Sequence, residues 1–246
     1  RLGGKTPLEC ALTPFLDQIA AHGTLGLVDT IPQGFTPGSD VANLSVLGYN
    51  PADTYTGRGP LEAASMGIHM NPDDVAYRCN LVCIGNKDTN EAFMDDFTAG
   101  HISSAEAAQV ISDLNRRLNS PLHQFFAGVG YRHLLVWRNA PASPKTTPPH
   151  DITGKPIAGY LPQDDFAPEI LELMSRAAEV LKDHPVNVRR RQEGKKEANS
   201  IWPWGQGKKP LISPFTEKYN LKGGMISAVD LLNGLGINAG LKPLRV

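Results

Sequence analysis

Cysteine is scarce in this sequence, and long apolar runs and an excess of one charge are missing. Only three of the 246 residues are cysteines, and an odd number does not make a complete disulfide framework. No apolar run approaches the ~20 residues of a membrane-spanning helix, and no basic segment followed by an apolar one opens the chain. The formal net charge of -1 argues against nucleic acid or a membrane surface as a partner. These absences predict a cytoplasmic globular protein with reduced thiols.

Local metal-ligand motifs are also absent. The seven histidines form neither an H-x3-H pair nor an H-E-x-x-H motif, so no metal site can be assembled from local spacing. Cys79 and Cys83 are spaced C-x3-C without a second pair, which favours buried strand cysteines over zinc ligands. The basic run at 189–196 could bind nucleic acid. A single run in a chain of near-zero charge favours a solvated loop or a surface that binds a small anion.

The sequence does contain clear helical and strand patterns. Apolar residues at helical spacing predict helices over residues 6–23, 103–118, 167–185 and 225–236. One face of the first helix is expected to be lined by apolar residues: Leu8, Ala11, Leu12, Phe15, Leu16 and Ile19. Clusters of β-branched and apolar residues predict strands at 75–84 and 131–137. Segments 138–156 and 189–210, rich in proline or in glycine and charge, are expected to be irregular, and the whole pattern indicates a layered α/β fold.

The stretch from residue 34 to 51 leaves two interpretations open. Gly38, Ser39 and Asp40 stand directly before a short apolar face of helical period. Ser39 or Asp40 can cap such a helix through a side-chain oxygen. The Ser39 hydroxyl could instead be a nucleophile, which would need a base or a metal because serine reacts weakly at neutral pH.

Several blocks of the sequence resemble, in the same order, the archaeal-type cofactor-independent phosphoglycerate mutases. These blocks are GSDVANLSVLGYNP, YTGRGPLEAASMGI, DVAYRCNLV, DFTAGHIS, YRHLLVW, HDITGKPI, HPVN with ANSIWPWGQG, and FTEKYNLKGGMISAVDLLNGLGI. The similarity covers essentially the whole chain. It implies the alkaline phosphatase superfamily, with a partial alkaline-phosphatase-like α/β core over residues 1–72 and 211–246. An inserted α/β (α+β) domain over residues 73–210 would help to hold the substrate.

The resemblance also implies a reaction, the interconversion of 3-phosphoglycerate and 2-phosphoglycerate through a phosphoserine. Ser39 would be the nucleophile and a ligand of two divalent ions, Mn²⁺, Mg²⁺ or Zn²⁺, and 2,3-bisphosphoglycerate would not be required. The family's other metal ligands, an Asp from a GDGM-like strand and an Asp/His cluster near the C-terminus, have no counterpart in the sequence. Since the chain also opens without Met, we expect a fragment that does not catalyse the reaction unaided.

A phosphoglycerate carries a carboxylate and a phosphate, and the family-like blocks contain arginines that suit both groups. Arg78, Arg132 and Arg190 are candidates because a planar guanidinium can hold either anion through two hydrogen bonds. A surface salt bridge is the alternative for each of them. His150 and Asp151 could bind the glycerate hydroxyls or move a proton between them, although Asp151 could simply cap a turn.

Three further residues are weaker candidates for binding the substrate. The resemblance points to Lys218 as a phosphate-side lysine, whereas Arg58 could be structural and Asn43 could either hold phosphate or face the core. Another small phosphorylated metabolite could be the substrate of a hydrolase or phosphotransferase of the same superfamily. A non-catalytic anion-binding module is a further alternative. A homo-oligomer or a partner segment would cover sheet edges that missing strands expose.

Overall fold

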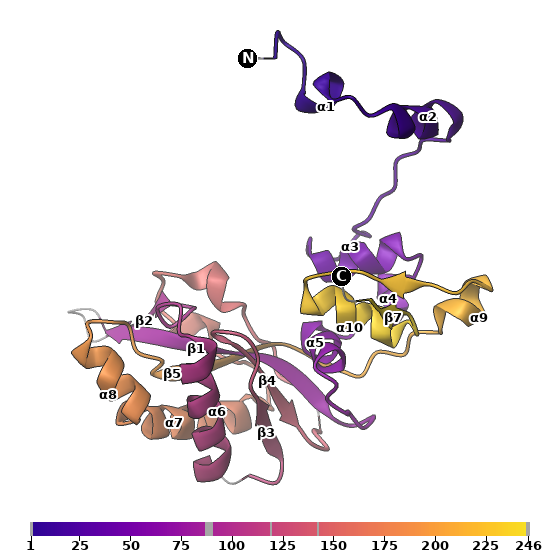
Figure 1. The fold of residues 1–246 in the computed structure, drawn as a ribbon. Helices are drawn as coiled ribbons and strands as arrows, with labels where there is room; N and C mark the ends of the chain where they lie inside the picture. The colour runs from indigo at the N-terminus through magenta and orange to yellow at the C-terminus, as the bar shows by residue number, and fades with distance from the viewer. Residues whose placement is uncertain (1, 87–90, 119, 142, 245–246) are drawn as a thin grey trace.

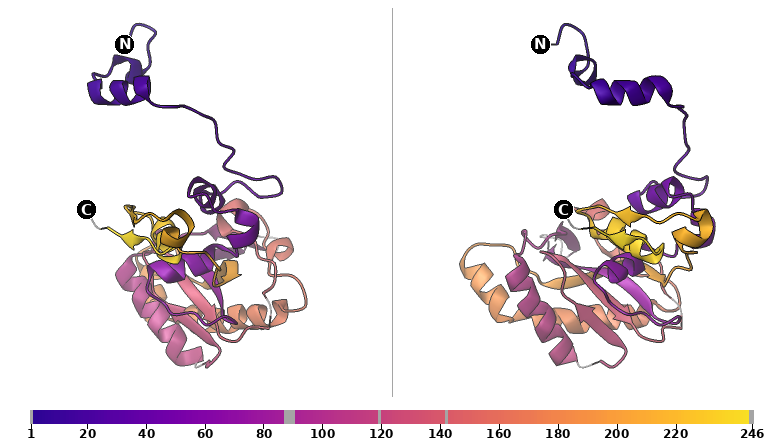
Figure 2. Two further views of the ribbon diagram at one scale, coloured as in Figure 1. Left: turned by 90° about the vertical axis from the view of Figure 1, so that its right-hand side faces the viewer. Right: turned by 45° about the vertical axis from the view of Figure 1, so that its right-hand side comes forward.

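The computed structural model describes residues 2–86, 91–118, 120–141 and 143–244. Figure 1 shows a body made of two groups of elements and an N-terminal segment that stands away from both. The two views in Figure 2 agree on this separation. No helix among the described residues has the length and apolar character needed to cross a bilayer.

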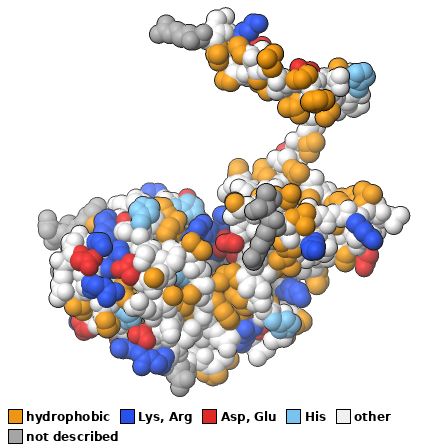
Figure 3. Space-filling view, viewed as in Figure 1, with side chains coloured by type: hydrophobic (Ala, Val, Ile, Leu, Met, Phe, Trp, Pro, Cys, Tyr) orange, Lys and Arg blue, Asp and Glu red, His pale blue; other side chains and the backbone are white. Residues whose placement is uncertain are grey.

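The N-terminal segment differs from the single helix expected over residues 6–23. It forms two short helices that bury no residue, α1 (Pro7–Cys10) and α2 (Pro14–His22). Thr13 leaves the helical conformation because the ring of Pro14 disfavours it in the preceding residue. The residues predicted to line one apolar face are exposed, with Leu12 at 98%. Figure 3 shows hydrophobic side chains gathered along this segment.

The larger group of elements is built on a five-stranded sheet in which every strand pair is antiparallel. Its strands are β1 (Val75–Asn86), β2 (Ala92–Asp96), β3 (His123–Phe126), β4 (Arg132–Trp137) and β5 (Ser200–Lys208). β1 is central, because it pairs with β2, β4 and β5, while β3 pairs with β4. The predicted strands at 75–84 and 131–137 are confirmed as β1 and β4. The fold is thus mixed α/β, as expected, with an antiparallel sheet.

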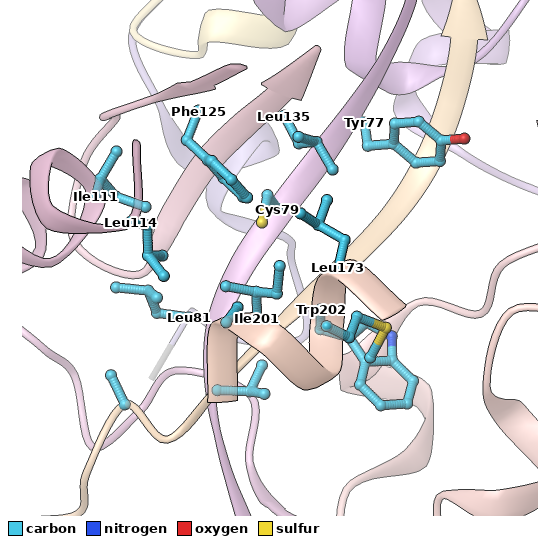
Figure 4. Close-up of a cluster of buried hydrophobic side chains, with 14 of the residues drawn as sticks. Tyr77, Cys79, Leu81, Ile111, Leu114, Phe125, Leu135, Leu173, Ile201 and Trp202 are labelled. Atoms are coloured by element: carbon cyan, nitrogen blue, oxygen red, sulfur yellow. The ribbon is translucent and has the colours of Figure 1, made fainter. Parts of the chain in front are cut away.

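Three helices pack on one face of this sheet: α6 (Ser104–Leu118), α7 (Ala167–Lys182) and α8 (Pro185–Gln192). The helices predicted over 103–118 and 167–185 are confirmed as α6 and α7. In Figure 4, Cys79 and Leu81 of β1 lie in one buried cluster with Ile111 of α6 and Leu173 of α7. Removal of this apolar surface from water is the main term that stabilises the larger group.

Residues 189–210 were expected to be irregular, but much of this segment has regular secondary structure. Its first residues end α8, and residues 200–208 form β5. Pro203 is tolerated because β5 pairs only with β1 among the described strands, and on an edge strand a proline nitrogen can face away from the ladder. The proline-rich segment 138–156 contains one short 3-10 helix, η1 (Pro149–Ile152), and a second, η2 (Ala158–Tyr160), follows it.

The smaller group of elements surrounds an apolar cluster of its own. It contains α3 (Ser39–Val46), α4 (Pro51–Thr54), α5 (Arg58–Ser65), α9 (Phe215–Tyr219) and α10 (Asp230–Asn238), with the parallel pair β6 (Gly224–Met225) and β7 (Lys242–Pro243). Leu44, Leu61 and Leu235 are buried together here. The helix predicted over 225–236 begins later than expected, because Met225 belongs to β6 and α10 starts at Asp230.

Helix α5 lies between the two groups and contacts both. Leu61 belongs to the cluster of the smaller group, and Ala63 packs against the sheet beside Ala76. The backbone of α5 lies very close to α10 on one side and to β1 on the other. A Cβ added at Gly234 of α10 would lie 1.7 Å from the Leu61 carbonyl oxygen, and one added at Gly59 would lie 2.3 Å from that of Ala76. Glycine at these two positions lets α5 pack tightly on both sides.

Replacing Gly234 with alanine is expected to lower the free energy of unfolding. The added methyl group would meet backbone rather than a flexible side chain, and overpacking of this kind costs about 1–3 kcal/mol. Urea unfolding followed by circular dichroism measures the change. Gly159→Ala is the matched control, because a Cβ there meets nothing within 4 Å. Equal stability of the two variants would contradict the close contact.

Candidate functional site

Two adjoining cavities open where α5 meets the sheet. The first, of about 660 Å³, is lined by Gly38 and Asp40 at the start of α3, by His150, and by Trp204. The second, of about 560 Å³, is lined by Arg78, Arg132, Glu62 and Asp230, among others. We call them the α3 cavity and the arginine cavity. Arg58, the first residue of α5, lines both.

The arginine cavity brings three predicted substrate residues together: Arg58, Arg78 and Arg132. Glu62 stands between the first two, with its Oε2 atom 3.1 Å from Arg78 Nε and its Oε1 atom 3.5 Å from Arg58 Nε. Burial lowers the pKa of Arg78 and raises the pKa of Glu62, and the opposite charge of each partner counteracts both shifts. Arg132 is exposed and forms no ion pair with the described part of the chain. The guanidinium groups of Arg58, Arg78 and Arg132 therefore have N–H donors that are free to bind an anion.

The indole ring of Trp204 forms a platform beneath two of these arginines. The guanidinium carbon of Arg78 lies 4.7 Å from the ring centroid and that of Arg58 lies 5.7 Å from it. Arg78 and Trp204 are direct cross-strand partners in the pairing of β1 with β5, so their side chains share one face of the sheet. Trp204 Nε1 donates a 3.0 Å hydrogen bond to Asn80 Oδ1, which fixes the tilt of the ring.

Ser39 begins α3 and is exposed to solvent. The residue in the N-cap position is Gly38, and the helix has no side-chain cap hydrogen bond. Capping by Ser39 or Asp40, which the sequence left open, is therefore not what the structure shows. Asp40 instead accepts hydrogen bonds from Tyr55 Oη at 2.6 Å and from the Val41 amide at 3.0 Å. Ser39 is thus an exposed residue at a helix N-terminus, and although Gly38 and Asp40 on either side of it line the α3 cavity, Ser39 itself belongs to the lining of neither cavity.

His150 and Asp151 lie together on η1 and line the α3 cavity. The imidazole of His150 packs edge-on against Trp204, with ring centroids 5.3 Å apart, and against Phe97 at 6.1 Å. His150 Nε2 is 3.6 Å from Asp151 Oδ1. Packing against Trp204 and Phe97 thus places the imidazole in the wall of the α3 cavity, next to the Asp151 carboxylate.

The structure does not bring Arg190 to either cavity. Its side chain is 2% exposed, with Nη2 donating to the Ala99 carbonyl at 2.7 Å and Nε to the Lys196 carbonyl at 2.8 Å. Nη1 reaches Glu106 Oε2 at 3.1 Å. These partners occupy the donors that the substrate-binding prediction assigned to an anion. Arg190 instead ties α8 to the start of α6 and to the loop before it.

Asn43 and Lys218 also lie outside the lining of both cavities. Asn43 Nδ2 donates a 2.6 Å hydrogen bond to the Ser39 carbonyl oxygen, so it supports the first turn of α3. Lys218 Nζ lies 5.5 Å from the ring of Tyr49 and 5.4 Å from that of Tyr219. The amide of Asn43 is thus engaged by the backbone, and the ammonium of Lys218 packs on aromatic faces in the smaller group.

Sequence reasoning missed Glu62 and Trp204 as members of the site. Glu62 follows Arg58 by four residues, a spacing that places the two side chains on one face of a helix. That signal is present in the sequence. Trp204 had no comparable signal, because its role depends on β5, which the sequence did not predict.

The described residues do not fit a site for two divalent ions. No group of three or more His, Cys, Asp or Glu side chains in this part of the chain could hold a metal ion. Asp40, the carboxylate nearest Ser39 in sequence, already bonds to Tyr55 and to the backbone. Sites for ions such as Mn²⁺ or Mg²⁺ need several converging oxygen or nitrogen ligands. The described residues around Ser39 therefore lack the ligands for a metal-assisted step.

Comparison with known proteins identifies the family of the chain. Residues 20–187 match the family model of 2,3-bisphosphoglycerate-independent phosphoglycerate mutase. The chain is 51% identical to the mutase of that name from Methanosarcina barkeri and 50% identical to a probable one from Geobacter sulfurreducens. All of this chain is covered in both alignments, but it spans only 61% of the length of either relative.

Two solved structures share this fold. One is a Pyrococcus horikoshii protein at 32% identity and a TM-score of 0.74, matched over 99% of this chain and 56% of that one. The other is the cofactor-independent phosphoglycerate mutase of Thermoplasma acidophilum, at 28% identity and a TM-score of 0.63, matched over 100% of this chain and 65% of that one. The chain belongs to the 2,3-bisphosphoglycerate-independent phosphoglycerate mutase family.

Proposed function

We propose that the chain carries the substrate cleft of an enzyme that interconverts 3-phosphoglycerate and 2-phosphoglycerate. The observation that supports this most directly is the arginine cavity, where Arg58, Arg78 and Arg132 converge. Two of these arginines have no hydrogen-bond acceptor within the described residues beyond the Glu62 carboxylate, and Arg132 has none. A small molecule with a carboxylate and a phosphate would supply the missing acceptors.

Ser39 is the proposed phosphoryl acceptor. Its oxygen would lose a proton and bond to phosphorus as the bond from phosphorus to the substrate oxygen breaks, and that glycerate oxygen would take up a proton. The adjacent glycerate hydroxyl would then lose its proton and accept the phosphoryl group, and the Ser39 oxygen would be protonated again. Ser39 is the first residue of the eight-residue helix α3, whose dipole and first N–H groups, apart from that of Val41, favour a phosphate there. His150 and Asp151 would move the proton between the two glycerate oxygens.

We further propose that residues 1–72 and 211–246 form part of an alkaline-phosphatase-like core and that 73–210 are the inserted domain. Two separate hydrophobic clusters support this division, one within the sheet group and one around α5 and α10. The proposal assigns Ser39 alone as a metal ligand in this chain. Mn²⁺, Mg²⁺ or Zn²⁺ remain the ions that the resemblance implies.

Substituting Arg132 with alanine tests the proposed substrate. The affinity for 3-phosphoglycerate, measured by isothermal titration calorimetry, should fall about tenfold, because a hydrogen bond to a charged group contributes about 1.5 kcal/mol or more. The melting temperature should not change, since Arg132 is exposed and unpaired among the described residues. Arg189→Ala is the matched control, because it removes the same charge from the exposed part of α8. Equal affinities for the two variants would count against the arginine cavity.

The chain by itself is expected to produce no 2-phosphoglycerate from 3-phosphoglycerate in the presence of Mn²⁺. The physical reason is that the described residues offer no cluster of three metal ligands. Phosphorus NMR of the mixture measures the product, with the Methanosarcina barkeri relative as the positive control. Sustained turnover by this chain would show that the metal ligands have been misjudged.

A further inference from the structure

Glu62 is an unexpected neighbour for an anion. It lines the arginine cavity, and only 14% of its side chain is exposed, so its negative charge is weakly screened by water. A carboxylate in that position repels an anionic ligand. On its own, the charge of Glu62 would lower the affinity of the cavity for an anion, so a favourable effect of this carboxylate would have to come from its contacts.

Glu62 contacts the guanidinium groups of both Arg58 and Arg78. Both of its oxygens approach Nε atoms, on the stem side of Arg58 and Arg78, at 3.5 and 3.1 Å. Neither buried Nε atom makes a well-aligned hydrogen bond, so Glu62 acts as a shared counter-charge rather than as a conventional acceptor. The outer Nη atoms of both arginines have no hydrogen-bond acceptor within the described residues. Glu62 therefore restrains each guanidinium from behind while its outer edge stays open.

Trp204 restrains the guanidinium groups of Arg58 and Arg78 from a second direction. Its ring face lies against both guanidinium groups, and its own Nε1 is anchored on Asn80. A guanidinium held by a counter-charge at its stem and by a π face below has little freedom to turn. Orientation of this kind lowers the entropy that is lost when a ligand binds.

We propose that Glu62 is a positioning residue that holds Arg58 and Arg78 with their Nη edges directed to one doubly charged ligand. The proposal rests on the proposed function, because it takes the ligand to be a phosphoglycerate. It extends that function by assigning a role to an acidic residue that itself cannot bind an anion. The alternative is that Glu62 only adjusts the net charge of the cavity.

The two roles predict opposite effects of Glu62→Gln. This substitution makes the cavity more positive by one charge, so a role in charge alone would tighten anion binding. A glutamine amide cannot neutralise both guanidinium groups, and its NH₂ would face one of them. We therefore expect the affinity for 3-phosphoglycerate to fall about tenfold, as calorimetry would measure. Glu62→Asp, which keeps the charge but is shorter, should also weaken binding.

Asp230→Asn is the matched control for charge. Asp230 lines the same cavity, but among the described residues its carboxylate accepts one side-chain hydrogen bond, from Ser65 Oγ at 3.3 Å, and forms no ion pair with an arginine. Removing its charge should tighten binding, whereas removing that of Glu62 should weaken it. Melting temperatures of all variants identify any that have lost the fold.

A double-mutant cycle separates positioning from general damage. If Glu62 acts through Arg78, Glu62→Gln should lower the affinity by less than about threefold once Arg78→Gln is in place. Tighter or unchanged binding by Glu62→Gln, or an undiminished loss in the double variant, overturns the positioning role. Inorganic phosphate serves as a second probe. If phosphate binds as tightly as 3-phosphoglycerate, while Glu62→Gln weakens both, the proposed substrate fails and the positioning role stands. If the unmodified chain binds neither, both proposals fail.

Discussion

Burying a positive charge inside a protein is costly, and the site depends on how the chain compensates that cost at Arg78. Its side chain is 9% exposed and belongs to the central strand of the sheet. A carboxylate from α5 and the indole face of Trp204 replace the water that the guanidinium loses. Both replacements come from other elements, so the charged site forms only when α5, β1 and β5 are assembled.

The packing of α5 decides whether that assembly is possible. Gly59 allows the helix to lie directly against the backbone of β1, and Gly57 allows the turn before it to approach Gln206 of β5. Gly57 also has a φ of +144°, which a residue with a side chain would adopt only with strain. Because Arg58 stands between these two glycines, its place over Trp204 follows from backbone contacts. Small residues in the TGRGP block thus determine where the large charged ones lie.

The sequence predicts several helices and strands of this arrangement, but it does not predict β5 or the contacts that form the site. The periodicities of β1, β4, α6 and α7 are strong because each element buries an apolar face. β5 was not predicted because Pro203 and two glycines interrupt its apolar pattern, and its pairing with β1 is a long-range contact. Arg78 and Arg190 show why the sequence alone does not identify which arginines belong to the site. Both are arginines in family-like blocks and both are buried, but Nη2 of Arg190 donates to backbone carbonyls and its Nη1 to Glu106, whereas the Nη atoms of Arg78 have no acceptor among the described residues. That difference lies in long-range contacts, which spacing along the chain does not record.

Arg58 lines both cavities, and this sharing has a thermodynamic consequence. Two separate small ions, one in each cavity, would compete for a single guanidinium, so the first to bind would disfavour the second. One molecule that bridges the cavities meets no such competition and loses its translational freedom only once. For the proposed anion site, this arrangement favours two charged groups joined by a short carbon skeleton over the same groups supplied separately.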